Sequence, residues 1–169
     1  IIVQPNAYRD DNRVTLAAIA ALGPGAKGVG VVQPGVSDAE LDRLTKGGIV
    51  AQRIFQLPNG AVGFDRMDEV MARVRPFGWH ANIQLDGRVL PQYEAQLKRL
   101  DGKFVIDHVG KYLEPVAPDH AAFKSLLSLL DTGRCWVKLS APYETSKTGA
   151  PKYEDVGRLA KALVKHAPE

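Results

Sequence analysis

The stretch "AKGVGVVQPGVSDAELDRLTKGGIVAQRIFQ", residues 26–56, contains the pattern on which the whole chain is built. Two apolar runs rich in β-branched residues, 26–34 and 48–56, flank a segment whose apolar residues recur at helical spacing. Ser37 is a suitable N-cap for that helix, and Glu40 stands three residues later in a capping-box position. A strand, a helix and a second strand in this order predict a right-handed βαβ crossover between parallel strands.

The same alternation continues along the chain in both directions. We expect strands at 1–6, 26–34, 48–56, 79–86, 103–110 and 135–143. We expect helices at 10–23, 37–48, 63–78, 90–102, 119–133 and 153–167, the first of them capped by Asp10 or Asp11. Six strand–helix units predict an α/β fold with a parallel sheet. Because no linker interrupts the series, we expect a single domain over residues 1–169.

Two architectures fit six such units, an open doubly wound sheet and part of a (β/α)8 TIM barrel. Doubly wound nucleotide-binding folds carry a glycine-rich turn after the first strand. Here the corresponding turn, "QPNAYRDDN" (4–12), has no glycine. A complete eight-unit barrel needs about 250 residues. The chain would therefore supply about six consecutive βα units of the barrel.

Composition narrows the classes of ligand. The net charge is +3, but the basic residues are scattered and lack interleaved aromatic residues, which argues against nucleic acid. No apolar run is long enough to span a bilayer, so we expect no membrane partner. The lone Cys135 stands in an apolar run and is expected in the core. A single cysteine fits a reducing compartment, which favours a cytoplasmic location.

Polar residues gather where the predicted strands end. In parallel α/β folds this end of the sheet binds ligands. The residues concerned are Gln4, Gln33, Arg53, Gln56, Gln84, Asp86, Asp107, His108, Lys138, Ser140 and Tyr143.

Among the four histidines, His108 alone stands at the carboxyl end of a predicted strand. It is either a core histidine bonded to a neighbour or a functional group. His80 begins a strand, while His120 and His166 fall in the first and last turns of helices, so structural roles are favoured for these three. Since neighbouring strand residues point to opposite faces, Asp107 is expected to face away from the pocket of His108, towards the helices or a loop that it ties down.

The other candidates each carry two interpretations. Arg53 interrupts an apolar strand and needs a partner, which is either a structural carboxylate or the carboxylate of a substrate. Lys138 is either half of a structural ion pair or a donor to a developing oxyanion. Ser140 and Tyr143 either bind a ligand or complete a turn. Gln84 begins "QLDG", which also reads as a plain strand-to-turn signal.

Several motifs resemble a known family. "VIDHVGK" (105–111), "WVKLSAPYETS" (136–146), "GWHANIQLDGR" (78–88) and "QPNAYRDDN" are similar to the amidohydrolase-2 branch of the amidohydrolase superfamily. This branch contains 2-pyrone-4,6-dicarboxylate lactonase and related sugar-acid and muconolactone hydrolases. The phrase "QRIFQLPNGAV" (52–62) most resembles the D-galactarolactone isomerase side of the branch.

The resemblance implies a (β/α)8 barrel enzyme of carbohydrate-acid or aromatic catabolism. It would open the cyclic ester of a small carboxylated molecule, a lactone, or alternatively isomerise a sugar-acid lactone. His108 and Lys138 would be catalytic, and Arg53 would lie near the substrate carboxylate. Gln84, Ser140 and Tyr143 would line the pocket. A divalent metal such as zinc is possible in the full-length parent, although no residue of this chain is assigned as a ligand.

The chain also departs from the family pattern. Members begin with a strand bearing His-x-His and end with a strand bearing an aspartate, and neither is seen here. We therefore expect an internal segment, strands two to seven of a longer parent, that is inactive alone because it lacks the general base. The alternative from another class is a non-enzymatic α/β module that binds a small carboxylate through Arg53.

Overall fold

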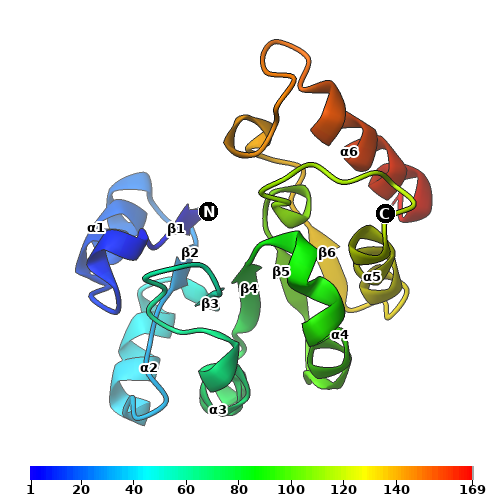
Figure 1. Cartoon of the computed structure of the whole chain (residues 1–169). Helices are drawn as coiled ribbons and strands as arrows, with labels where there is room; N and C mark the ends of the chain where they lie inside the picture. The colour runs from blue at the N-terminus through cyan, green and yellow to red at the C-terminus, as the bar shows by residue number, and fades with distance from the viewer. Residues whose placement is uncertain (169) are drawn as a thin grey trace. The chain divides into compact units, whose positions relative to one another are not determined.

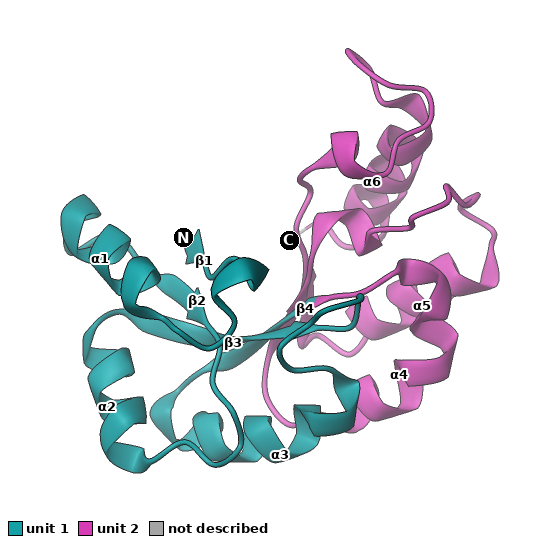
Figure 2. Cartoon of the chain, turned by 60° about the vertical axis from the view of Figure 1, so that its left-hand side comes forward, with its two compact units in different colours: residues 1–83 teal, residues 84–169 magenta. Residues whose placement is uncertain are grey.

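The computed structural model describes residues 1–168. These residues fall into two compact units, Ile1–Ile83 and Gln84–Glu169, which are coloured separately in Figure 2. Each unit has its own set of buried apolar side chains. The expectation of a single domain over the whole chain stays a prediction.

Strands and helices alternate along the chain in the predicted order (Figure 1). Unit 1 contains β1 (Ile2–Val3), α1 (Arg13–Leu22), β2 (Gly28–Gly30), α2 (Asp38–Lys46), β3 (Ile49–Phe55) and α3 (Phe64–Val74). The strand β4 (His80–Gln84) ends at the unit boundary. Unit 2 contains α4 (Leu90–Arg99), β5 (Phe104–Ile106), α5 (Ala121–Leu130), β6 (Cys135–Val137) and α6 (Glu154–His166).

The strands pair in parallel within each unit. In unit 1 they follow the order β1-β2-β3-β4, with parallel pairing of β1 with β2 and of β2 with β3. In unit 2, β5 pairs in parallel with β6, so that Phe104 lies opposite Cys135. Parallel pairing brings the carboxyl ends of neighbouring strands to one edge. The sheet thus presents the end of β5 beside the end of β6.

The strand β2 is much shorter than the predicted 26–34, and two side-chain amides explain where it ends. The Asn12 amide donates to the Val31 carbonyl oxygen at 2.7 Å and accepts from the Val31 N–H at 2.9 Å. The Gln52 amide does the same for Val32, at 3.2 and 2.9 Å. These backbone groups are buried and must be satisfied. Side chains have therefore replaced the sheet hydrogen bonds beyond Gly30.

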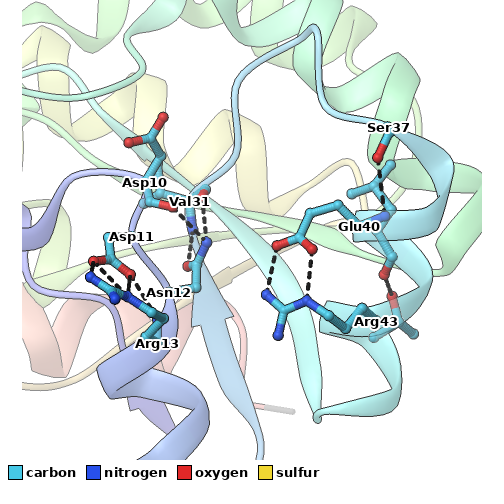
Figure 3. Close-up of polar contacts among 10 residues, drawn as sticks. Asp10, Asp11, Asn12, Arg13, Val31, Ser37, Glu40 and Arg43 are labelled. Atoms are coloured by element: carbon cyan, nitrogen blue, oxygen red, sulfur yellow. Dashed lines mark hydrogen bonds and ion pairs between the residues drawn. The ribbon is translucent and has the colours of Figure 1, made fainter.

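The start of α1 corrects one prediction (Figure 3). The helix begins at Arg13, its N-cap position is Asn12, and the Asn12 side chain makes no capping hydrogen bond. Asp10 is therefore not the cap. Asp11, the residue before the N-cap, binds a backbone N–H at the start of the helix: its carboxylate accepts from the Arg13 N–H at 3.2 Å. Hydrogen bonds from the Arg13 side chain and backbone lower the pKa of Asp11 to about 2.

The start of α2 confirms the prediction that Ser37 is its N-cap. The Ser37 side chain accepts from the Glu40 N–H at 3.2 Å, as an N-cap should (Figure 3). The Glu40 carboxylate binds both nitrogens of the Arg43 fork at 2.7 Å. The capping half of the predicted motif is thus present, while the glutamate is held one turn along the helix.

Two of the histidines have structural partners in unit 2. The His120 ring accepts from the Ala122 N–H at 3.1 Å and so caps α5. His166, in the last turn of α6, lies 2.7 Å from an Asp131 carboxylate oxygen. Cys135 is buried as expected, and burial raises the pKa of its thiol to about 12. These observations confirm the structural interpretations of His120 and His166 and the core position expected for Cys135.

Candidate functional site

The stretch that carries His108 is a strained turn. The predicted strand 103–110 ends at Ile106, and residues 108–110 form a 3₁₀ turn. His108, Val109, Gly110 and Lys111 all have positive φ, at 54°, 56°, 87° and 46°. Such angles suit glycine but are a genuine outlier for a β-branched residue such as Val109. Strain of this kind gathers at functional sites.

Hydrogen bonds from two neighbouring segments hold the turn. The Val109 N–H donates to the Lys138 carbonyl oxygen at 2.8 Å, and the Lys138 N–H donates to the Ile106 carbonyl oxygen at 2.9 Å. On the other side, the Gly87 N–H donates to the Lys111 carbonyl oxygen at 3.3 Å. The turn is thus fixed by the end of β6 and by the segment after β4.

The His108 ring lies between a hydroxyl and a carboxylate. Its Nδ1 atom is 2.9 Å from the Ser140 Oγ, which is a hydrogen bond. Its Nε2 atom is 3.9 Å from Oε1 of Glu144, and the second oxygen of that carboxylate is bound by the Lys111 ammonium group. The His108 side chain is 21% exposed. It is therefore oriented by the protein and still reachable by a small molecule.

Lys138 forms an ion pair with Asp107. The Lys138 Nζ atom is 2.7 Å from an Asp107 carboxylate oxygen, and the Asp107 side chain is 3% exposed. This pair is one of the two interpretations of Lys138, and Asp107 does tie down a neighbouring segment. The argument from strand alternation does not apply, however, because the strand ends before Asp107. Asp107 and His108 both contact the segment that follows β6.

A buried aspartate at the start of α6 holds the loop that carries Glu144. The Asp155 carboxylate accepts from the Ser146 hydroxyl at 2.6 Å, the Thr148 hydroxyl at 2.9 Å, and the Lys147 and Val156 N–H groups at 2.7 and 2.9 Å. Burial on its own would raise the pKa of Asp155, but these hydrogen bonds hold it well below its usual range. The loop is thereby fixed to the helix.

A small cavity opens beside the His108 turn. It measures about 140 Å³ and is lined by Val109, Ser140, Val156 and Gly157 among others. Ligand pockets for drug-sized molecules are usually larger, at about 300–1,000 Å³. The cavity therefore suits part of a small molecule. Tyr143, which follows Ser140 by three residues, is 70% exposed.

Arg53 belongs to unit 1, whereas the other candidate site residues belong to unit 2. It is half-buried in β3, its Nη1 atom donates to the Gln4 carbonyl oxygen at 2.6 Å, and its guanidinium lies 4.7 Å from the centre of the Phe55 ring. Gln84, at the end of β4, is 5% exposed. The structure thus joins His108 directly to Ser140. The roles of Arg53, Gln84, Lys138 and Tyr143 towards a substrate stay predictions.

The whole chain, residues 1–169, matches the sequence profile of the family described as Amidohydro_2, amidohydrolase. The chain belongs to this amidohydrolase family. Solved structures agree: a crystal structure of an Agrobacterium tumefaciens protein shares 33% identity and a TM-score of 0.92, covering 99% of this chain and 58% of that one. The alternation of parallel strands and helices, together with this structural match, confirms the barrel fold class. The chain supplies six strand–helix units of that fold.

Curated relatives of this amidohydrolase carry lactone names. They are D-galactarolactone isomerase of Agrobacterium fabrum, 34% identical over 169 residues, and 2-pyrone-4,6-dicarbaxylate hydrolase of Comamonas testosteroni, 30% identical over 181 residues. A 4-sulfomuconolactone hydrolase of Hydrogenophaga intermedia is 28% identical over 172 residues. Each comparison covers 100% of this chain. The chain spans 58%, 59% and 56% of the lengths of these relatives.

Two residues of the candidate site were not predicted from the sequence. Lys111 and Glu144 both fall inside the family motifs, "VIDHVGK" and "WVKLSAPYETS", but neither stands at the end of a strand. Their contact joins residues 33 positions apart. Only the family motifs could have identified Lys111 and Glu144 as candidates, because their spacing along the chain does not predict that they form an ion pair.

The described part of the chain contains neither a cluster of metal-binding side chains nor a membrane-spanning helix. Within residues 1–168, no three His, Cys, Asp or Glu side chains are grouped so that they could hold a metal ion. Over the same residues, no helix is both long and apolar enough to cross a membrane.

Proposed function

We propose that the intact protein acts at the ring carbonyl of a lactone derived from a small carboxylated molecule. The observation that supports this most strongly is the His108 imidazole, held by Ser140 at the carboxyl end of β5 in a chain whose relatives are named for lactones. The carboxyl ends of the strands are where barrel enzymes place their active sites.

The chemistry is acyl transfer. An oxygen nucleophile loses its proton and attacks the lactone carbonyl, so that negative charge develops on the carbonyl oxygen. The ring C–O bond then breaks, and the leaving oxygen takes up a proton. His108, anchored through Nδ1 by the Ser140 hydroxyl, presents Nε2–H as a donor to that oxygen. Lys138 and Tyr143 are secondary donors, and Gln84 lines the pocket. Arg53 binds the substrate carboxylate through its planar fork and holds the ring in position for attack.

Hydrolysis and isomerisation use the same groups. Water is the nucleophile in hydrolysis, while a hydroxyl of the substrate itself attacks in isomerisation and yields a lactone of another ring size. Identity to the isomerase is 34%, against 30% for the pyrone hydrolase. We therefore favour a sugar-acid lactone and the isomerase outcome over hydrolysis.

The test is a panel of lactones offered to the full-length protein and followed by NMR, which reports acid release and ring interconversion separately. The panel is run with and without a chelator. Interconversion supports the isomerase and acid release the hydrolase. Binding without turnover would instead support the non-enzymatic carboxylate-binding module.

Variants of the full-length protein test the residues. We expect His108→Ala to lower kcat by about 100-fold, since loss of one oxyanion donor costs about that much. We expect Arg53→Ala to raise KM more than it lowers kcat. His166→Ala, which removes a surface histidine, is the matched control. Near-normal turnover in His108→Ala would show that its catalytic role is wrong, and unchanged affinity in Arg53→Ala would exclude the carboxylate clamp.

A further inference from the structure

Both nitrogens of the His108 ring face groups from a single segment of chain, residues 140–144. Ser140 bonds to Nδ1 at 2.9 Å, and the nearest carboxylate oxygen of Glu144 lies 3.9 Å from Nε2. At 3.9 Å the carboxylate is too far for a direct hydrogen bond. It is close enough to stabilise positive charge on the ring and leaves the Nε2 proton available to another acceptor.

Lys111 fixes the carboxylate in this position. Its side chain is only 10% exposed, and its ammonium group binds Oε2 of Glu144. Lys111 itself is held by the left-handed turn that also carries His108. The two ends of the arrangement, His108 and Lys111, therefore come from one rigid turn, and Glu144 lies between them. A carboxylate anchored through one oxygen presents the other to the imidazole.

We propose that Glu144 is a positioning residue that holds the His108 imidazole in its protonated form, aimed at the oxygen of the lactone carbonyl. This rests on the proposed function. In the imidazolium both nitrogens are donors, so that Nδ1–H donates to the Ser140 hydroxyl and Nε2–H to the substrate oxygen. A charge-assisted hydrogen bond is about twice as strong as a neutral one.

The charges around the ring set the size and sign of the effect. Glu144 lies 3.9 Å from the ring and is bound by Lys111, while Asp107, the residue before His108, pairs with Lys138. From α6, Asp155 lines a second, much smaller cavity together with His108, of about 10 Å³. The Glu144 carboxylate favours the charged form of the ring, and Lys111 offsets part of that effect.

Two variants of the full-length protein should therefore act in opposite directions. Glu144→Gln removes the negative charge at nearly constant shape, so the alkaline limb of the kcat profile should move to lower pH. Lys111→Met removes the offsetting positive charge, so the same limb should move higher. In both variants kcat at the optimum should fall about tenfold, with KM within about twofold, because the ring is no longer held in place.

The control is Glu114→Gln, which removes a carboxylate from an exposed ion pair with Lys147 in the same unit. It should leave the pH profile unchanged. Ring-nitrogen chemical shifts of His108, recorded by NMR without substrate, report its protonation directly and should move in the same directions as the kinetic limb. A merely structural role would lower stability or kcat without moving the titration in opposite directions.

The outcomes separate this inference from the proposed function. If the unmodified protein turns over a lactone while Glu144→Gln titrates like Glu114→Gln, the inference is overturned and the proposed function stands. A common direction of shift in Glu144→Gln and Lys111→Met would overturn it as well. If the unmodified protein turns over no lactone, the proposed function fails, while the NMR titration of His108 without substrate still shows whether Glu144 and Lys111 act on the ring in opposite directions.

Discussion

Asn12→Ala is the substitution for which the structure gives the most definite energetic expectation. The amide makes hydrogen bonds to the N–H and carbonyl of Val31, which is 4% exposed, and a third to the Asp10 carbonyl oxygen at 3.1 Å. Removing it leaves two buried backbone groups of Val31 unsatisfied, at about 1–3 kcal/mol each. We expect the free energy of unfolding to fall by about 3 kcal/mol, because water that enters the vacated space hydrogen-bonds to the Val31 backbone and recovers part of the combined cost. For a chain of this length that lowers Tm by roughly 6–12 °C.

The assay is urea unfolding of the full-length protein, combined with hydrogen exchange at the Val31 amide. Asn6→Ala is the matched control, because the Asn6 amide donates a single bond to the Asn59 carbonyl oxygen at 2.8 Å in an exposed position. Water replaces that bond, so the control should lose less than about 1 kcal/mol. A loss in Asn12→Ala no larger than in Asn6→Ala, or unchanged exchange at Val31, would refute the reasoning.

Two further substitutions test how the site is supported. A Cβ at Gly87 would overlap the Gly110 carbonyl oxygen, so Gly87→Ala should shift the His108 turn, lowering stability by about 2 kcal/mol and kcat by about tenfold, whereas Gly25→Ala, which meets open space, should change neither. Asp155→Asn should lower the urea midpoint at neutral pH. Since the folded-state pKa of Asp155 lies below its ordinary 3.8, the stabilisation is fully present above that value and is lost as pH falls further. The difference from the unmodified protein should stay constant between about pH 5 and 8 and shrink below about pH 4; a difference that persists unchanged at pH 3 would contradict this.

The order of the elements could be predicted from the sequence because it depends on local periodicity. The apolar spacing of each helix and the β-branched runs are visible within about ten residues. The Ser37 cap could be predicted as well, because its hydrogen-bond partner, Glu40, is only three residues away. The ends of the strands could not be predicted in this way. At β2 the limit is set by Asn12 and Gln52, which come from other elements and supply amides in place of backbone partners.

In the candidate site, too, local features could be predicted and long-range contacts could not. His108 was recognisable because it is a titratable residue at the carboxyl end of a strand, and its contact with Ser140 joins two residues that had both been singled out. The partners Lys111 and Glu144 were missed because a strand-end criterion excludes them. The left-handed turn was also missed, since a valine gives no indication of a positive φ.

Val109 has a consequence for attempts to engineer this protein. Glycine, or to a lesser extent asparagine, adopts its backbone angles with much less strain. At position 109 this relief of strain competes with the loss of a side chain that is only 3% exposed. Glycine would also widen the range of conformations open to the turn, and with it the spread of orientations of the His108 ring. Selection at this position should impose stability and turnover together, because a gain in one is obtained here by loosening the other.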